Sequence, residues 1–343
     1  MLEPHRRSRT AAAFRIISAA GLIAAGLAGC GGSDGSGPRS DAPDGQQAPS
    51  VAATAGVGSG QPGSAEAVAQ PGLRLPPPAG VWPDVSLARP ELPRGGRTLF
   101  PRYRLVGYAG HPTSDGMGRL GIGDIDQRAR ELERRARSYA AGRTAQPVFE
   151  LIAVVATSFP GPAGLYRSRA EPAVVDEFLA AARRHRALLL LNVQPGRADF
   201  LPEVKAFERW LREPDVGLAL DPEWAVGPGQ VPGEVYGWTS GAELDRVARY
   251  LAGIVKRYDL PEKPLVFHQV AASVVQDQQD LRRHRGVVVI KSVDGIGPRH
   301  PKETTWRRLV SDLPPAIHTG FKLFFVEDTA SGPLMTPAQV LAL

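Results

Sequence analysis

Two carboxylates stand two positions apart in the stretch from Leu218 to Val226, which reads LALDPEWAV. Asp221 and Glu223 follow a short apolar run, and Pro222 between them favours the end of a strand because it has no N–H to donate. Side chains alternate along an extended chain, so both carboxylates are expected on one face. This pattern is typical of a turn, or of catalytic groups at the end of a buried strand.

Other apolar runs of the chain also carry polar residues, usually near their ends. Read by alternation, these residues share the inward face with Asp221 and Glu223; they are Glu150, Asn192, Gln194, His268, Lys322 and Asp328. A buried charge without a partner costs several kcal/mol, so such a set must be mutually paired or must face a wet cavity. Taken alone, His268 would be interpreted as a histidine of the core. Lys322 alone would be interpreted as half of a buried ion pair with Glu150. Together they favour a functional pocket.

The motifs restrict the chemistry of this pocket. Residues 97–343 have no G-x-S-x-G serine elbow, C-x-x-C or H-E-x-x-H, the motifs of serine nucleophiles and common metal sites. We expect no cofactor and no metal; the alternative is a metal held by carboxylates and His268. Carboxylates are plentiful, and glycoside hydrolysis uses two of them, one protonated and one ionised.

Trp224 and Trp238 flank the loop after the fourth strand and either stack on a sugar or pack that loop. Asp294, in DGIG, indicates a ligand-facing loop or a tight turn.

Apolar runs and amphipathic segments alternate along the domain that carries these residues. The expected strands are 104–110, 147–156, 187–194, 216–221, 264–270, 286–294 and 320–328. The expected helices are 126–141, 172–185, 200–212, 240–258, 272–284 and 302–312. Strands that are apolar throughout are covered on both faces, and strict alternation predicts a parallel sheet.

We therefore predict an α/β fold, a TIM-type (β/α)8 barrel that is distorted or has seven clear strands. Its eighth strand lies in the terminal TPAQVLAL, or the barrel is incomplete. An open doubly wound sheet is the alternative, but no glycine-rich phosphate loop follows the first strand. Catalytic groups of a barrel come from the carboxyl ends of its strands.

The placement of the acids resembles the large clan of retaining glycosidases built on barrels. In that clan the acid/base glutamate follows strand four and the nucleophile ends strand seven. The resemblance implies Glu223 as acid/base and either Glu327 or Asp328 as nucleophile, and parity with Lys322 favours Asp328. The clan's usual strand-four pair is Asn-Glu, whereas this chain has Asp-Pro-Glu.

At the level of motifs, the domain is similar to a family of exported bacterial proteins, many of them lipoproteins, without an established activity. The shared motifs run in order from Tyr108 to the end of the domain and include QPGR at 194–197, LDPEW at 220–224, His268-Gln269, DGxG at 294–297 and GFKLF at 320–324. This resemblance implies a barrel-like fold on an exported protein and supplies no reaction.

The first 96 residues are expected to lie outside the barrel. Residues 1–29 have arginines followed by the apolar segment IISAAGLIAAGL, which fits a lipoprotein signal peptide. It ends in Leu-Ala-Gly-Cys, which resembles a lipobox, so Cys30 is the expected lipidation site. Residues 30–96 are rich in Pro, Gly and Ala and predict a disordered tether. The barrel domain is then 97–343.

Charge and partners follow from this division. The chain carries +6, of which residues 1–30 hold +3 through four arginines and Glu3. The remaining +3 comes mainly from arginines scattered over helix faces, so we expect no nucleic-acid partner. We expect the protein to be exported and anchored by lipid to the outer face of the cell membrane. Its partner would be a polysaccharide or other glycan.

Two functions fit this sequence. The first is a glycoside-hydrolase-like enzyme on cell-envelope or extracellular polysaccharide, with Glu223 as general acid/base and Asp328 as nucleophile or stabiliser. The other predicted site residues would bind substrate: Glu150, Asn192, Gln194, Asp221, Trp224, His268, Asp294 and Lys322. The second is a non-catalytic lipoprotein that binds a glycan or a wall component in the same pocket.

Overall fold

The computed structural model describes residues 89–330 and 332–343 of the chain. The expected signal peptide, Cys30 and the tether up to residue 88 lie outside the described residues. Within the described part, no helix is long and apolar enough to cross a membrane.

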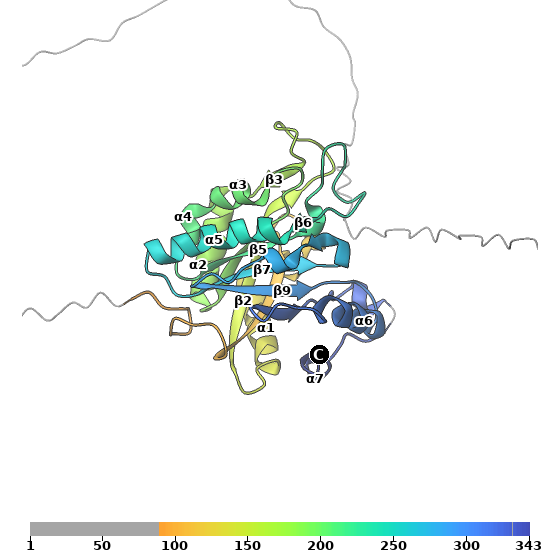
Figure 1. Ribbon diagram of the computed structural model, residues 1–343. Coiled ribbons are helices and arrows are strands. Elements are labelled where there is room, and N and C mark those ends of the chain that lie inside the picture. Colours follow the sequence, from red (N-terminus) through yellow and green to blue (C-terminus); the bar gives the residue numbers. More distant parts are fainter. Residues whose placement is uncertain (1–88, 331) are drawn as a thin grey trace, which may run out of the picture. The chain divides into compact units, whose positions relative to one another are not determined.

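Seven parallel strands form one curled sheet, in the order β1-β2-β4-β5-β7-β9-β10 (Figure 1). Their bounds are β1 Tyr103–Gly110, β2 Thr144–Ala156, β4 Leu188–Val193, β5 Val216–Leu220, β7 Lys263–Gln269, β9 Val287–Val293 and β10 Ile317–Phe321. The short β3, Arg167–Arg169, pairs antiparallel with β2. A separate two-stranded parallel sheet joins β6, Thr239–Ser240, to β8, Val275–Gln276. The sheet forms a half-barrel, consistent with a distorted TIM-like barrel.

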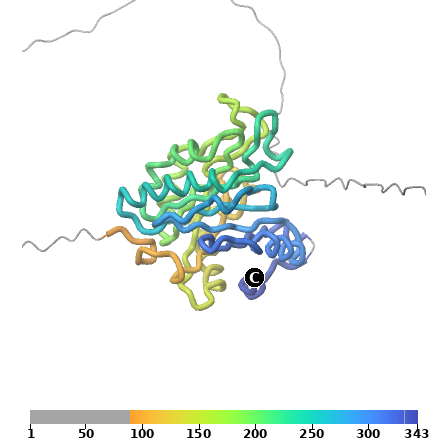
Figure 2. The backbone as a smooth tube through the Cα atoms, viewed as in Figure 1, coloured from red at the N-terminus to blue at the C-terminus, as the bar shows by residue number. Residues whose placement is uncertain are grey.

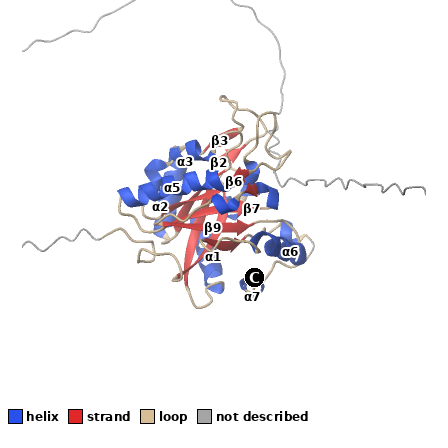
Figure 3. Ribbon diagram, in the orientation of Figure 1, coloured by secondary structure: helices blue, strands red, loops and turns tan. Residues whose placement is uncertain are grey.

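Helices cover the outer face of this sheet. Figure 3 shows α2, α3 and α5 on one side of the strands, and their contacts with β2, β4, β7 and β9 agree with this placement. The α-helices are α1 Ile125–Ser138, α2 Pro172–Arg184, α3 Phe200–Lys205, α4 Glu208–Leu211, α5 Gly241–Arg257, α6 Arg299–Val310 and α7 Pro337–Leu341. Six 3-10 turns complete the described elements: Asp115–Met117, Arg119–Gly121, Pro222–Trp224, Ala272–Val274, Gln278–Asp280 and Glu327–Thr329. Helix α5 begins where the sequence predicts, because the Ser240 side chain accepts a hydrogen bond from the Glu243 N–H.

The inner face of the sheet holds a second apolar core, separate from the one beneath the helices. Its members include Val148, Leu190, Ala219, Val266 and Ile290, one inward residue from each of five strands. The segment before β1 fills the amino-terminal end of this core with the buried side chains of Leu92 and Leu99, which are 3% and 0% exposed. Figure 2 shows this segment, in orange, at the end of the sheet where the strands begin.

The two edges of the sheet, β1 and β10, do not pair through their backbones in the described chain. Side chains bridge them instead. The Phe100 and His318 rings lie 4.5 Å apart between centroids at the amino-terminal end. The Tyr108 and Phe325 rings meet edge to face, with centroids 5.8 Å apart.

Three predicted elements differ from the structure. The seventh strand ends at Phe321 instead of 328, and the chain then turns through a 3-10 helix at Glu327–Thr329. The predicted helix 272–284 is wrong, because that segment forms two 3-10 turns around β8. The terminal TPAQVLAL supplies helix α7 in place of an eighth strand, since Thr336 and Gln339 form a capping box at its start.

Candidate functional site

A layer of polar side chains lies directly above the inner apolar core, at the carboxyl ends of the strands. Each polar residue follows an inward-facing residue by two positions, so strand alternation puts it on the same face. The pairs are Val148 and Glu150, Leu190 and Asn192, Ala219 and Asp221, Val266 and His268, Ile290 and Ser292, and Gly320 and Lys322. The structure therefore brings together residues that lie more than 170 positions apart in the chain.

His268 occupies the centre of this layer. Its Nδ1 lies 3.0 Å from Oδ1 of Asp294, and its Nε2 lies 3.0 Å from Oε1 of Glu150. Burial disfavours a charged ring, but the carboxylates of Asp294, Glu150 and Asp221 outweigh it and raise the pKa of His268 well above its usual value. The carboxylates on both sides of the His268 ring therefore favour its charged form.

Two amide side chains orient the carboxylates beside His268. Asn192 Nδ2 donates to Glu150 Oε1 at 2.8 Å and to Asp221 Oδ1 at 2.9 Å. Gln194 Nε2 donates to the other oxygen of Asp221 at 3.1 Å. The carbonyl of Gln194 in turn accepts from the backbone N–H of Ala156 at 3.2 Å, which fixes the amide's orientation. Both oxygens of Asp221 are thus bonded.

Lys322 and Asp294 form the other ion pair of the layer, with Nζ 3.1 Å from Oδ2. The Ser292 hydroxyl donates to Asp294 Oδ1 at 3.0 Å. Burial opposes ionisation of Asp294, yet His268 and Lys322 hold its pKa far below the usual range. Burial opposes ionisation of Glu150 too, and His268 and Lys322 nevertheless lower its pKa to about 2.

Glu223 is the exception among these carboxyl groups. Burial raises its pKa to about 8, and the negative charges of Asp221 and Asp294 add to that effect, with only partial opposition from His268. Its Oε2 is buried and has no hydrogen-bond partner among the described residues. At neutral pH the layer thus combines one protonated carboxyl, Glu223, with the ionised carboxylates of Glu150 and Asp294.

The LDPEW stretch positions this acid as the sequence suggests. Strand β5 ends at Leu220, and a 3-10 turn over Pro222–Trp224 follows directly. The Glu223 carbonyl accepts from the Gly237 N–H at 2.7 Å, and the Trp238 N–H donates to the Ala225 carbonyl at 3.0 Å. A Cβ at Gly237 would lie 2.2 Å from the Ala225 oxygen, so only glycine permits this close approach. The loop bearing Trp238 is thus bound to the turn bearing Glu223.

The two tryptophans differ in exposure. Trp238 is 54% exposed, whereas Trp224 is half-buried. Of the two, Trp238 therefore offers the larger free face beside the turn that carries Glu223.

Asp328 belongs to a different arrangement from the one parity suggested. Because β10 ends at Phe321, Lys322 directly follows the strand and Asp328 lies beyond it, where strand alternation no longer applies. Its Oδ2 lies 2.9 Å from Lys302 Nζ and accepts from the Phe324 N–H at 2.9 Å, while Oδ1 accepts from the Gly297 N–H at 3.0 Å. The carboxylate joins the loops after β9 and β10. The alternative nucleophile, Glu327, lies in the same 3-10 turn.

Sequence reasoning missed two members of this region. Ser292 follows inward-facing Ile290 by two positions, so strand alternation could have identified it. Lys302 lies in helix α6, where its buried ammonium pairs with Asp328 and also bonds the Gly295 carbonyl. No strand pattern could have indicated it, because helix side chains follow a different period.

The geometry also tests whether the site could hold a metal. One ligand atom each of Glu150, Asp221 and His268 lies within 4.8 Å of the others. Asp294 beside Nδ1 is the carboxylate partner that metal-bound histidines commonly have. A cation at these atoms would compete with the close contact between His268 Nε2 and Glu150 Oε1.

Comparison with known proteins identifies no relative. No known family matches the chain, and no curated protein or solved structure is significantly similar to it. The resemblances to barrel glycosidases and to exported lipoproteins therefore stay predictions, and the chemistry of the site rests on its own geometry.

Proposed function

We propose that the protein is a glycoside-hydrolase-like enzyme whose general acid is Glu223. The observation that carries this proposal is the contrast within one polar layer: Glu223 Oε2 is buried without a hydrogen-bond partner among the described residues, whereas Asp294 and Glu150 are paired with His268. Burial accordingly raises the pKa of Glu223, while the cations beside Asp294 and Glu150 lower theirs. Glycosidic bond cleavage needs a protonated carboxyl at the leaving oxygen and negative charge near the developing sugar cation.

The roles follow from the contacts of each group. Glu223 donates its proton to the leaving oxygen, since its Oε2 has no competing partner among the described residues. A water then adds to the anomeric carbon and gives a proton back to the Glu223 carboxylate. The carboxylates of Asp221 and Asp294 both act electrostatically on Glu223, which supports a role for their negative charge in stabilising a sugar cation formed beside it. The predicted role of Asp328 as the nucleophile is not part of this proposal, because Lys302 and two backbone N–H groups already occupy its carboxylate.

Exposed apolar side chains support a carbohydrate ligand at the same end of the sheet. In the described part of the chain, all large hydrophobic side chains that are exposed lie on loops following the carboxyl ends of β2, β5, β9 or β10. They are Phe159, Val235, Tyr236, Trp238, Ile296 and Val326. Aromatic faces with a free side stack on sugar rings. We propose Trp238 as the first such platform, because its loop is bonded to the Glu223 turn.

The location of the enzyme forms part of the proposal. The apolar segment ending at Cys30 supports export and lipid anchoring to the outer face of the cell membrane. A polysaccharide of the cell envelope or its surroundings would then be the accessible substrate.

A glycan-binding lipoprotein is the second candidate. It is favoured by the pairing of the ionised groups, since Asp294 and Glu150 have cationic and amide partners that satisfy them without any reaction.

The decisive experiment compares three forms of the protein on a panel of envelope and extracellular polysaccharides, measuring release of reducing ends. Glu223→Gln should lower turnover by about 10²- to 10⁴-fold, the usual contribution of a general acid, and should keep glycan binding. Glu234→Gln is the matched control, because Glu234 is exposed on the same loop, and it should behave as the wild type. Full activity of Glu223→Gln would refute the assignment. A wild-type protein that binds glycans but cleaves none would favour the binding function.

A further inference from the structure

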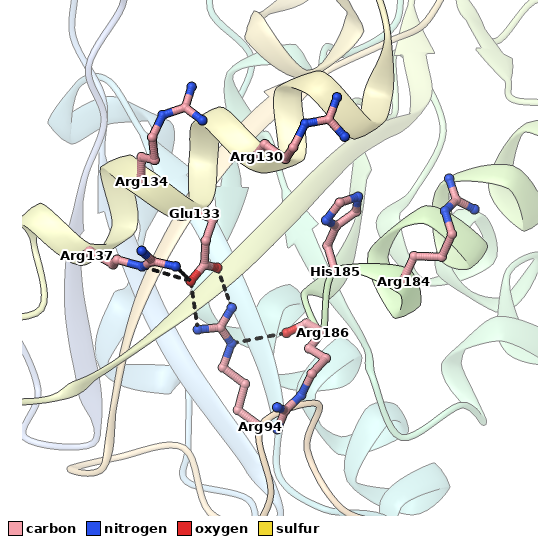
Figure 4. Close-up of a pocket in the computed structure, with 8 residues that line it drawn as sticks. All are labelled: Arg94, Arg130, Glu133, Arg134, Arg137, Arg184, His185 and Arg186. Atoms are coloured by element: carbon pink, nitrogen blue, oxygen red, sulfur yellow. Dashed lines mark hydrogen bonds and ion pairs between the residues drawn. The ribbon is translucent and has the colours of Figure 1, made fainter.

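A cleft rich in arginine lies at the opposite end of the sheet from Glu223, between α1, the end of α2 and the segment before β1 (Figure 4). Its volume is about 430 Å³. The lining residues are Arg94, Arg130, Glu133, Arg134, Arg137, Arg184, His185 and Arg186. Six arginines and one histidine therefore surround a single acid.

The sequence places three of these arginines on one stripe of α1. Arg130, Arg134 and Arg137 are spaced by four and three positions, so they lie on the same helix face. The other arginines of this helix, Arg128 and Arg135, serve another face: Arg128 pairs with Glu131, and Arg135 donates to the Tyr108 hydroxyl. The stripe at the cleft is thus distinct from the arginines that attach α1 to the sheet.

The opposite wall of the cleft is held in place by backbone contacts. Arg94 donates to the Ala145 carbonyl at 2.8 Å, at the beginning of β2. Arg186 Nε donates to the Pro93 carbonyl at 3.0 Å. These bonds fix two cationic groups before any ligand binds, which reduces the entropy that binding would cost.

The acids available to this cleft are fewer than its cations. Glu133 pairs with both Arg94 and Arg137, and Asp126 with both Arg184 and His185. Arg130 and Arg134 have no hydrogen bond or ion pair with any described residue.

The dipole of helix α1 explains only part of the excess of arginines over acids in the cleft. Cations in the last turn of a helix are stabilised by its dipole, and Arg137 has that position. Arg130 and Arg134 lie earlier in α1, where two like charges four residues apart repel each other. Their repulsion would be relieved by an anion bound between them and the opposite wall.

We propose that this cleft binds a compact ligand carrying two or more phosphate groups. Guanidinium forks match phosphate oxygens in a bidentate manner, and Arg130 and Arg134 carry such forks without a partner among the described residues, whereas the fork of Arg94 is engaged by Glu133. The volume exceeds what one phosphate needs. The inference is independent of the proposed hydrolase function, because the cleft shares no residue with the layer around Glu223.

The test is calorimetric titration of the full chain with tripolyphosphate at low ionic strength. The wild type should bind, and the Arg130→Gln/Arg134→Gln double variant should bind about tenfold more weakly or worse. Arg246→Gln/Arg285→Gln is the matched control, since it removes the same charge from exposed residues elsewhere, and its affinity should stay within about twofold of the wild type. Circular dichroism and thermal melting establish that each variant is folded.

Three results would overturn the proposal. They are a wild type that does not bind tripolyphosphate, a double variant that binds as well as the wild type, and equal losses in the double variant and the control. A parallel arm uses vesicles of phosphatidylglycerol and of phosphatidylcholine. Binding to the anionic vesicles without binding of tripolyphosphate would assign the arginines to a membrane surface and would also overturn it.

Discussion

The two ends of the sheet treat charge in opposite ways. At the carboxyl end, His268 and Lys322 are buried among carboxylates, and each ionised group lies against an opposite charge or an amide. At the amino end, Arg130 and Arg134 are exposed and unpaired among the described residues. Buried charges must be matched within the protein, whereas exposed ones are stabilised by water and salt.

This difference shows which groups at each end of the sheet remain available for a reaction or for a ligand. At the carboxyl end, every ionised group is paired, and Glu223 alone stays outside these ion pairs. Its protonated carboxyl group is suited to proton donation. The amino end has an excess of positive charge, because Arg130 and Arg134 lack acidic partners there. These arginines could bind an anion from solution. The net charge of the chain predicts neither the protonated acid at one end nor the excess of arginine at the other, because it is only the sum over both ends.

The largest expected effect on stability comes from removing a buried carboxylate at the carboxyl end of the sheet. Asp294→Asn removes the carboxylate shared by His268, Lys322 and Ser292. We expect it to lower the free energy of unfolding by about 3–5 kcal/mol, because buried cations lose their partner. Urea denaturation measures this loss.

Asp126→Asn is the counterpart at the amino end. Asp126 pairs with Arg184 and His185, but 33% of its side chain and 53% of that of Arg184 are exposed. The expected loss is about 0–1 kcal/mol. Equal losses in Asp126→Asn and Asp294→Asn would remove the distinction between the two ends.

A pH-dependent effect isolates Glu223. Its folded pKa of about 8 lies above the ordinary value of 4.5, so between these values the folded state binds more protons than the unfolded state. Its stabilising contribution is complete below pH 4.5 and is lost as the pH rises through about 8. Glu223→Gln lacks this dependence and should gain stability relative to the wild type between pH 5 and pH 9. A stability difference that is constant over this range would contradict a raised pKa.

The smallest effect is expected at the arginine stripe. Arg130→Gln/Arg134→Gln should raise the free energy of unfolding by about 0.2–0.5 kcal/mol at low salt, because it removes repulsion between like charges four residues apart. The gain should vanish in concentrated sodium chloride, which screens exposed charges. Thermal melts at two salt concentrations measure it, and a gain that persists in high salt would point to a cause other than charge.

Strand alternation predicted much of the carboxyl end. Glu150, Asn192, Asp221 and His268 each lie within or just after a strand, and the period of two is enough to place them on one face. Their convergence required only that neighbouring strands be parallel, which the alternation of strands and helices indicated.

Alternation failed where the strand itself ended early. GFKLFFVED is apolar to residue 326, yet β10 stops at Phe321 and the following residues form loop and 3-10 turn. Asp328 consequently bonds Lys302 of α6, a contact between distant segments that no local pattern contains. The segment 272–284 failed for a similar reason, since β8 pairs with β6 and interrupts the expected helix.

The arginine cleft was interpreted from sequence as solvated helix faces. A helical period separates Arg130, Arg134 and Arg137 from Arg128 and Arg135, but it does not reveal what faces the stripe. The opposite wall comes from Arg94 and Arg186, which lie 36 or more positions away in the chain. Tertiary packing therefore makes the difference between a solvated face and a candidate site.

The protonation state of Glu223 is the most direct test of the account. Side-chain carboxyl ¹³C signals of a glutamate-labelled protein can be followed by NMR from pH 4 to pH 10, with Glu223→Gln used to assign the resonance. We predict that the Glu223 signal stays at the position of a protonated carboxyl at pH 6 and shifts with a midpoint near pH 8. A signal that is already that of a carboxylate at pH 6 would contradict the role of Glu223 as the general acid.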